Sequence, residues 1–288
     1  MHPQTIERAT LQGSGVALVA DVVGPADGPP LLFLHGSGQT RQSWGATIAR
    51  AAARGYRAYA VDLRGHGDSQ WATDGDYDME RFVDDTRCCI DQIDGRPAII
   101  GASLGGLVGL RIAGSPPPAL AALVLVDITP QIDMSGANEV IAFMGSAPDG
   151  FVSLDAAADA VAAYLPHRPR PRTNSGLLRN LRLRDDGRYH WHWDPAFLDV
   201  GRDAARRKGD TGVLDESARR TTAPTLLIRG GRSRLVSDEN VRAFLALVPH
   251  AETIDIADAH HMVAGDANDR FGEAAFDFLD RHLRPQAG

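Results

Sequence analysis

The pentapeptide GASLG at residues 101–105 constrains this chain more than any other stretch. A short apolar run, 97–100, precedes it, and a helical pattern of small residues, 104–110, follows it. A G-x-S-x-G sequence between a strand and a helix predicts a turn so tight that only glycine fits on its two sides. Such a turn exposes the hydroxyl of its central serine above the sheet. We therefore expect Ser103 to be a nucleophile at the end of a buried strand.

Segments typical of strands and of helices alternate along most of the chain. The predicted strands cover 5–12, 16–23, 30–34, 56–62, 97–100, 120–126, 224–230 and 252–256, and the predicted helices cover 44–54, 79–93, 104–110, 238–247 and 271–283. Continuous apolar runs such as 30–34 are typical of strands buried on both faces. The alternation predicts an α/β fold with a mainly parallel sheet and helices on both faces.

The alternation stops in the middle of the chain. Residues 128–221 contain several prolines, many arginines and a strongly aromatic stretch at 189–195. We therefore predict a core formed by residues 1–127 and 222–288, with residues 128–221 inserted as a cap. Within the cap, an Asp-Gly pair between two alternating segments predicts a β-hairpin.

Charge, apolar runs and cysteine usage narrow the binding partners and the cellular compartment that we expect for this chain. The formal net charge is −7, so there is no basic excess to neutralise the phosphates of a nucleic acid. No apolar run is long enough to cross a bilayer, and the N-terminus lacks the pattern of a signal peptide. Cys88 and Cys89 are adjacent and would form a strained disulfide, which favours reduced thiols. We expect a cytoplasmic protein that acts on a small-molecule substrate, without a nucleic-acid or membrane partner.

A serine hydroxyl is a weak nucleophile and needs a general base that is itself oriented by an acid. His260 and His261 follow the last predicted strand, at the carboxyl edge of the sheet where open α/β sheets place their sites. His35 and His66 also follow predicted strands. Topology alone therefore leaves four histidines as candidate bases.

Several of these motifs occur together in one known family. The chain has His35-Gly36 after its third predicted strand, RGHGDS at 64–69 after the fourth, the turn at Ser103, and a late His-Met pair at 261–262. In this combination the chain resembles the α/β-hydrolase superfamily over nearly its whole length. The inserted segment also falls where such proteins carry a cap.

The resemblance implies roles for several residues. His261 would be the base, with His260 as the alternative, and His35 and His66 would brace the loops around the site. The backbone N–H groups of Ser37 and Leu104 would form the oxyanion hole.

The position of the acid departs from the common pattern. Most similar proteins carry it about three residues past a glycine that follows the strand at 224–230, but this chain has Ser233 there. Asp238 comes later, at the expected start of a helix, where the helix dipole favours a negatively charged side chain. Asp127 ends the strand that follows the turn's helix, and some α/β-hydrolases place their acid there. We expect Asp127 to be the acid; Asp238, or no functional acid, are the alternatives.

The cap's aromatic stretch allows two interpretations. Tyr189, Trp191 and Trp193 would share one face of a strand and form the small core of the cap. In the alternative, Trp191 or Trp193 walls the substrate pocket. One of three arginines then pairs with a substrate carboxylate, the candidates being Arg41, Arg179 and Arg182. His190 and His192 alternate on the other face, but no third ligand is evident, so we predict no metal site.

Together these features predict a cofactor-free serine hydrolase that cleaves an ester, amide, thioester or lactone through an acyl-enzyme. With the same residues, perhydrolysis of the haloperoxidase type and hydrolysis of a carbon–carbon bond are alternatives. A ligand-binding protein with a slow or vestigial triad is a further alternative from another class. A serine nucleophile disfavours epoxide hydrolases and haloalkane dehalogenases, which need an aspartate at that position.

Overall fold

The computed structural model describes residues 5–116, 120–166, 173–200, 204–259 and 268–284. Its centre is an eight-stranded sheet of order β1-β2-β4-β3-β5-β6-β9-β10. The strands are β1 (Glu7–Gln12), β2 (Ala17–Val23), β3 (Pro30–Leu34), β4 (Arg57–Val61), β5 (Ala98–Ala102), β6 (Ala122–Val126), β9 (Thr225–Gly230) and β10 (Glu252–Ile256). Strand β2 is antiparallel to β1 and β4, and all other pairs are parallel. The predicted mainly parallel sheet is confirmed.

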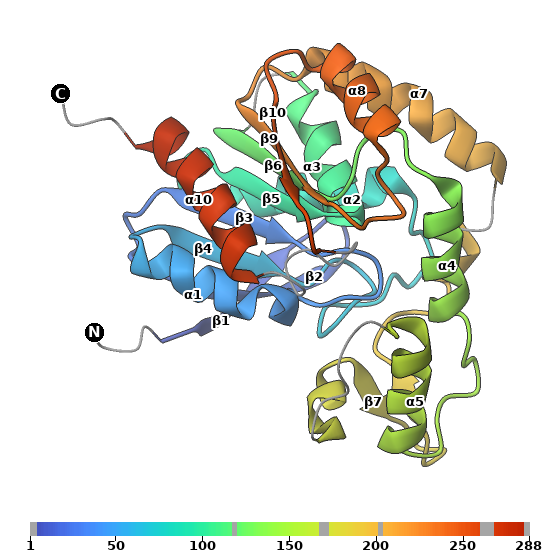
Figure 1. Cartoon of the computed structure of the whole chain (residues 1–288). Coiled ribbons are helices and arrows are strands. Elements are labelled where there is room, and N and C mark those ends of the chain that lie inside the picture. The colour runs from blue at the N-terminus through green and yellow to red at the C-terminus, as the bar shows by residue number, and fades with distance from the viewer. Residues whose placement is uncertain (1–4, 117–119, 167–172, 201–203, 260–267, 285–288) are drawn as a thin grey trace.

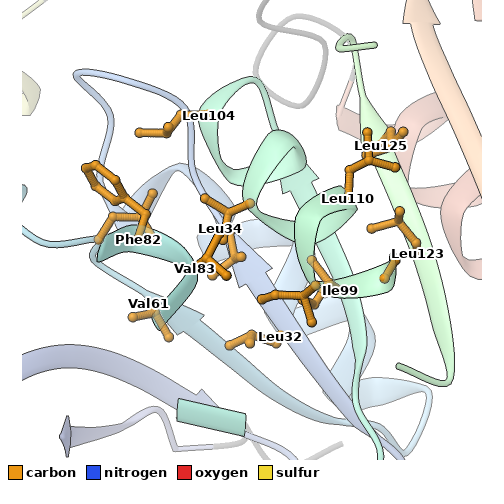
Figure 2. Close-up of a cluster of buried hydrophobic side chains, with 14 of the residues drawn as sticks. Leu32, Leu34, Val61, Phe82, Val83, Ile99, Leu104, Leu110, Leu123 and Leu125 are labelled. Atoms are coloured by element: carbon orange, nitrogen blue, oxygen red, sulfur yellow. The ribbon is translucent and has the colours of Figure 1, made fainter. Parts of the chain in front are cut away.

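Helices cover both faces of this sheet (Figure 1). They are α1 (Gly45–Ala53), α2 (Met79–Asp91), α3 (Leu104–Ala113), α7 (Ala204–Arg220), α8 (Asp238–Leu247) and α10 (Asn268–Leu283). Because side chains alternate along a strand, Leu32 and Leu34 of β3 belong to one hydrophobic cluster and Leu31 and Phe33 to another. The first cluster includes residues of α2, α3, α7 and α8, and the second includes residues of α1 and α10. Figure 2 shows the first cluster, in which side chains of β3 and β5 lie beneath α3.

The range predicted as a cap, residues 128–221, contains helices α4 (Met134–Met144), α5 (Leu154–Tyr164) and α6 (Phe197–Val200) and the hairpin strands β7 (Leu181–Leu183) and β8 (Tyr189–Trp191). The hairpin prediction is confirmed, since β7 and β8 pair antiparallel around a turn in which Gly187 has a φ of +76°. Much of the cap has a hydrophobic cluster of its own, formed by Met144, Phe151, Ala157, Leu181, Trp191 and Trp193. The last helix of the range, α7, instead packs against α3 and contributes Leu214 and Ala218 to the core cluster. In Figure 1, α5 and β7 lie well away from α7.

Candidate active site

The turn between β5 and α3 holds Ser103 in an uncommon backbone conformation. Its φ is +47° and its ψ is −117°, a region that residues other than glycine rarely adopt. A Cβ atom on Gly101 would lie 2.6 Å from the nitrogen of Gly106, and one on Gly105 would lie 2.6 Å from the carbonyl carbon of Leu34. Neither position has room for a side chain. The two glycines therefore permit the tight turn that the sequence predicts, with Ser103 at its apex.

Asp127 leaves the sheet beside Ser103. Strand β6 pairs with β5 so that Val126 lies opposite Ala102, and the N–H of Ser103 donates to the carbonyl of Val126 at 3.3 Å. The Asp127 side chain is fully buried, and its φ is +50°, a conformation that aspartate tolerates better than most residues.

Two hydrogen bonds orient the carboxylate of Asp127. Its Oδ1 accepts from the N–H of Gly230 at 3.0 Å, and its Oδ2 accepts from the hydroxyl of Ser233 at 2.6 Å. Ser233, which stands where most similar proteins carry the acid, thus binds Asp127, the predicted acid, at the end of the neighbouring strand. The resemblance draws attention to position 233, but nothing in the sequence pairs it with Asp127.

The alternative acid, Asp238, lies at the surface. It is in the first turn of α8, where Ser237 caps the helix, and its side chain is 75% exposed. Its carboxylate pairs with Arg229 at 2.5 Å, and this contact holds the pKa of Asp238 below its usual value. Of the two predicted acids, only Asp127 is buried beside the turn of Ser103.

The loop after β3 brings a peptide group against Ser103. A Cβ atom on Gly36 would lie 3.1 Å from the Cβ of Ser103, so glycine allows this close approach. The carbonyl of Gly36 accepts from the Nδ1–H of His35 at 2.8 Å and from the N–H of Gln39 at 3.1 Å. In a trans peptide the N–H points opposite to the C=O. These two bonds therefore fix the direction of the Ser37 N–H, a predicted oxyanion donor.

The second predicted donor is the N–H of Leu104. Leu104 is the first residue of α3, and the first N–H groups of a helix have no partner within it. The same end of the helix carries the positive end of its dipole, which favours negative charge. The two predicted donors, the amides of Ser37 and Leu104, thus come from two different elements, the loop after β3 and the start of α3.

Two of the four candidate bases are buried and neutral. The Nε2 of His35 accepts from the N–H of Leu63 at 2.9 Å while its Nδ1 donates, so this ring is a neutral tautomer with both nitrogens engaged. The Nδ1 of His66 donates to the carbonyl of Arg64 at 2.9 Å. Burial lowers the pKa of His35 to about 4 and that of His66 to about 3. Both rings serve as braces of the loops, in line with the role that the resemblance implies.

The predicted base lies outside the described residues. The description of that segment reaches Ala259, three residues past the end of β10, and resumes at 268, so His260 and His261 are not placed. Within the described ranges, no three histidine, cysteine, aspartate or glutamate side chains gather as metal ligands would.

The cap contacts the loops that surround Ser103. The Nδ1 of His192 accepts from the N–H of Gly67 at 2.7 Å, and its Nε2 donates to the carbonyl of Gly38 at 3.3 Å. Burial lowers the pKa of this histidine well below its usual value. The thioether of Met144 also packs against Gly38, where a Cβ atom would lie 3.2 Å from its sulfur. The sequence suggests His192 only as a metal ligand, a role that the absence of an evident third ligand disfavours, so its contacts with the loops are not predicted.

Two of the three predicted substrate-binding arginines have carboxylate partners within the protein. Arg41 is buried and pairs with Asp62, with Asp21 at 2.8 Å and with Asp68 at 3.0 Å. Arg182 reaches from β7 to Asp68 at 2.7 Å. Arg179 is exposed.

The two predicted tryptophans lie in the cluster of the cap. The rings of Trp191 and Trp193 stack with their centroids 4.9 Å apart, and both are buried. This arrangement agrees with the interpretation that they form the core of the cap.

Comparison with known proteins identifies the family. The sequence model of the α/β-hydrolase fold matches residues 29–267, so the chain belongs to this family. It is 31% identical over 246 residues to an esterase of Mycobacterium tuberculosis, Rv0045c, covering 83% of this chain and 78% of that protein. It is 26% identical over 251 residues to the 3-hydroxybutyrate-oligomer hydrolase of Cupriavidus necator, covering 82% and 84% of the two chains.

Solved structures agree. The crystal structure of the Mycobacterium tuberculosis esterase has a TM-score of 0.75 at 28% identity, covering 96% of this chain and 92% of that one. That of E-2-(acetamidomethylene)succinate hydrolase has a TM-score of 0.83 at 23% identity, covering 96% and 100%, and supports the fold. In the described part of the chain, no helix is both long and apolar enough to cross a membrane.

Proposed function

We propose that this protein is a serine hydrolase that cleaves carboxylic esters through an acyl-enzyme. The observation that carries the proposal is the conformation of Ser103, held at positive φ directly against Gly36. Backbone strain of this kind is typical of active sites, including the turn that carries the nucleophile of serine hydrolases. The relatives include esterases, which favours esters among the acyl compounds that such a serine can attack.

The proposed steps give each group of the predicted triad one role. The hydroxyl of Ser103 attacks the acyl carbonyl while His261 takes its proton, and Asp127 fixes the tautomer of His261 and stabilises its charged form. The N–H groups of Ser37 and Leu104 donate to the oxygen that becomes negative. His261 then returns the proton to the leaving alcohol, and water hydrolyses the acyl-enzyme by the same route.

The surroundings of the oxyanion loop favour a neutral acyl group. Met144 places an apolar thioether beside Gly38, next to Ser37. Arg41 and Arg182 already form ion pairs with a carboxylate of the protein itself, that of Asp68. We therefore infer that neutral esters are better substrates than half-esters of dicarboxylic acids. If Arg179→Ala lowered the turnover of half-esters alone, a cap arginine would bind a substrate carboxylate and this preference would be wrong.

A broad panel of p-nitrophenyl and alkyl esters, combined with fluorophosphonate labelling, tests the proposal. We expect one adduct on Ser103 and a loss of kcat by about 10⁴-fold in Ser103→Ala, Asp127→Asn and His261→Ala. Asp238→Asn and His260→Ala are the matched controls and should retain activity. Folded protein that acquires no adduct on Ser103 would instead support a ligand-binding protein with a vestigial triad.

A further inference from the structure

The loop after β9 meets the carboxylate of Asp127 through one hydroxyl. The Oγ of Ser233 lies 2.6 Å from Oδ2 of Asp127, 3.0 Å from the nitrogen of Leu235 and 3.4 Å from the nitrogen of Val236. A serine hydroxyl has one hydrogen to donate and two lone pairs that accept. Two N–H groups occupy the lone pairs, so the hydroxyl hydrogen is directed at Asp127.

This hydroxyl is one of two donors from the loop after β9 that orient the acid. Gly230 donates to one carboxylate oxygen and Ser233 to the other, and both donors come from the same short segment. Hydrogen bonds to a charged acceptor are stronger than neutral ones. The carboxylate of Asp127 is therefore held in a single plane while it remains ionised.

We propose that Ser233 is a positioning residue for the triad acid and that position 233 can host the acid itself. The inference rests on the proposed function, in which Asp127 orients the base. The amides of Leu235 and Val236 already point at the side chain of residue 233. In Ser233→Asp the Cγ would stand near the present Oγ, with oxygens roughly 1.2 Å beyond it. Those oxygens would reach toward the place of the Asp127 carboxylate, whose Oδ2 is 2.6 Å from that Oγ.

The first arm of the test compares Ser233→Ala with Ser233→Thr on a turned-over ester. Loss of the hydroxyl should lower kcat by about tenfold and leave KM within about twofold, because the substrate is bound but the base is less well oriented. Threonine keeps the donor and should restore most of kcat. Ser233→Ala with the kcat of the wild-type protein overturns the positioning role. Far-UV circular dichroism and thermal unfolding establish that each variant is folded.

The second arm exchanges the two residues. Asp127→Ser should be nearly inactive, and the double variant Asp127→Ser/Ser233→Asp should recover at least about tenfold in kcat, since the carboxylate returns to almost the same place. Ser233→Asp alone puts two carboxylates together and should be slower than the wild-type protein. A double variant no more active than Asp127→Ser overturns the claim that position 233 can host the acid.

The parent variants separate this inference from the proposed function. If Ser103→Ala and Asp127→Asn keep the wild-type rate, the proposed function fails and the inference falls with it. If both are inactive while Ser233→Ala is fully active, only the role of Ser233 is refuted.

Discussion

Replacing Ser103 by glycine should stabilise the fold while removing the proposed nucleophile. Ser103 has a φ of +47° and a ψ of −117°, and a non-glycine residue held in such a region costs about 1–3 kcal/mol. Glycine adopts this conformation without steric cost. It also makes the unfolded chain more flexible, and this extra conformational entropy lowers the gain in stability by about 0.5–1 kcal/mol. Alanine removes the hydroxyl and keeps the strain. We therefore expect Ser103→Gly to exceed Ser103→Ala by about 1 kcal/mol in free energy of unfolding.

Urea unfolding at neutral pH measures this difference, provided that the two variants have equal m-values. In thermal unfolding, about 1 kcal/mol corresponds to roughly 1.5–2 °C for a chain of 288 residues. Ser146 supplies a matched control, because it is exposed and is not among the residues with positive φ. There the glycine variant should be the less stable of the pair. If Ser103→Gly has a urea midpoint at or below that of Ser103→Ala, the turn stores no backbone strain and the reasoning is refuted.

Three further predictions concern the core, the buried histidines and the cap. Gly105→Ala should lose about 3 kcal/mol in urea unfolding, because the new Cβ would lie 2.6 Å from a carbonyl carbon of β3; an unchanged midpoint would contradict the close approach. The pKa values of His35 and His66 lie below the 6.5 of an unfolded histidine. The unfolded chain therefore binds more protons, and stability should fall as the pH drops from 6.5 toward 4, which unfolding at pH 7 and pH 5 compares. Arg182→Ala removes a half-exposed ion pair between the cap and the loop after β4. It should cost less than about 1 kcal/mol and raise KM for esters, whereas Arg179→Ala should change neither.

The sheet could be predicted from the sequence because each buried strand is a short apolar run between turn residues. The predicted helix at 238–247 coincides with α8, whose start is marked by a capping serine. Helices α4, α5 and α7 were not predicted. Helix α7 is rich in charge and contains two glycines, so its local propensity is weak. It is helical because it packs against α3, and this contact cannot be predicted from the sequence of α7 alone.

The local parts of the site could also be predicted from the sequence, whereas the contacts between residues far apart in the chain could not. The turn at Ser103 follows from two glycines within five residues. The bond between Asp127 and Ser233 joins positions 106 residues apart, and no periodicity relates them. The density of arginines in the sequence predicts Arg41 as one of three possible partners of a substrate carboxylate. Its aspartate partners come from two separate segments, β2 and the loop after β4, and only the folded chain shows that they pair with it.

The contacts of His192 link the cap to the loop that carries Ser37, a proposed oxyanion donor. This residue follows β8 in the cap, yet it donates to the carbonyl of Gly38 and accepts from the N–H of Gly67. Gly38 is the next residue after Ser37, whose N–H direction His35 sets from the opposite side of the peptide. A change in the cap that displaces His192 would therefore also displace the loop after β3 that carries Ser37, a proposed oxyanion donor. Because an oxyanion donor acts only as charge develops, such a change should alter kcat as well as KM.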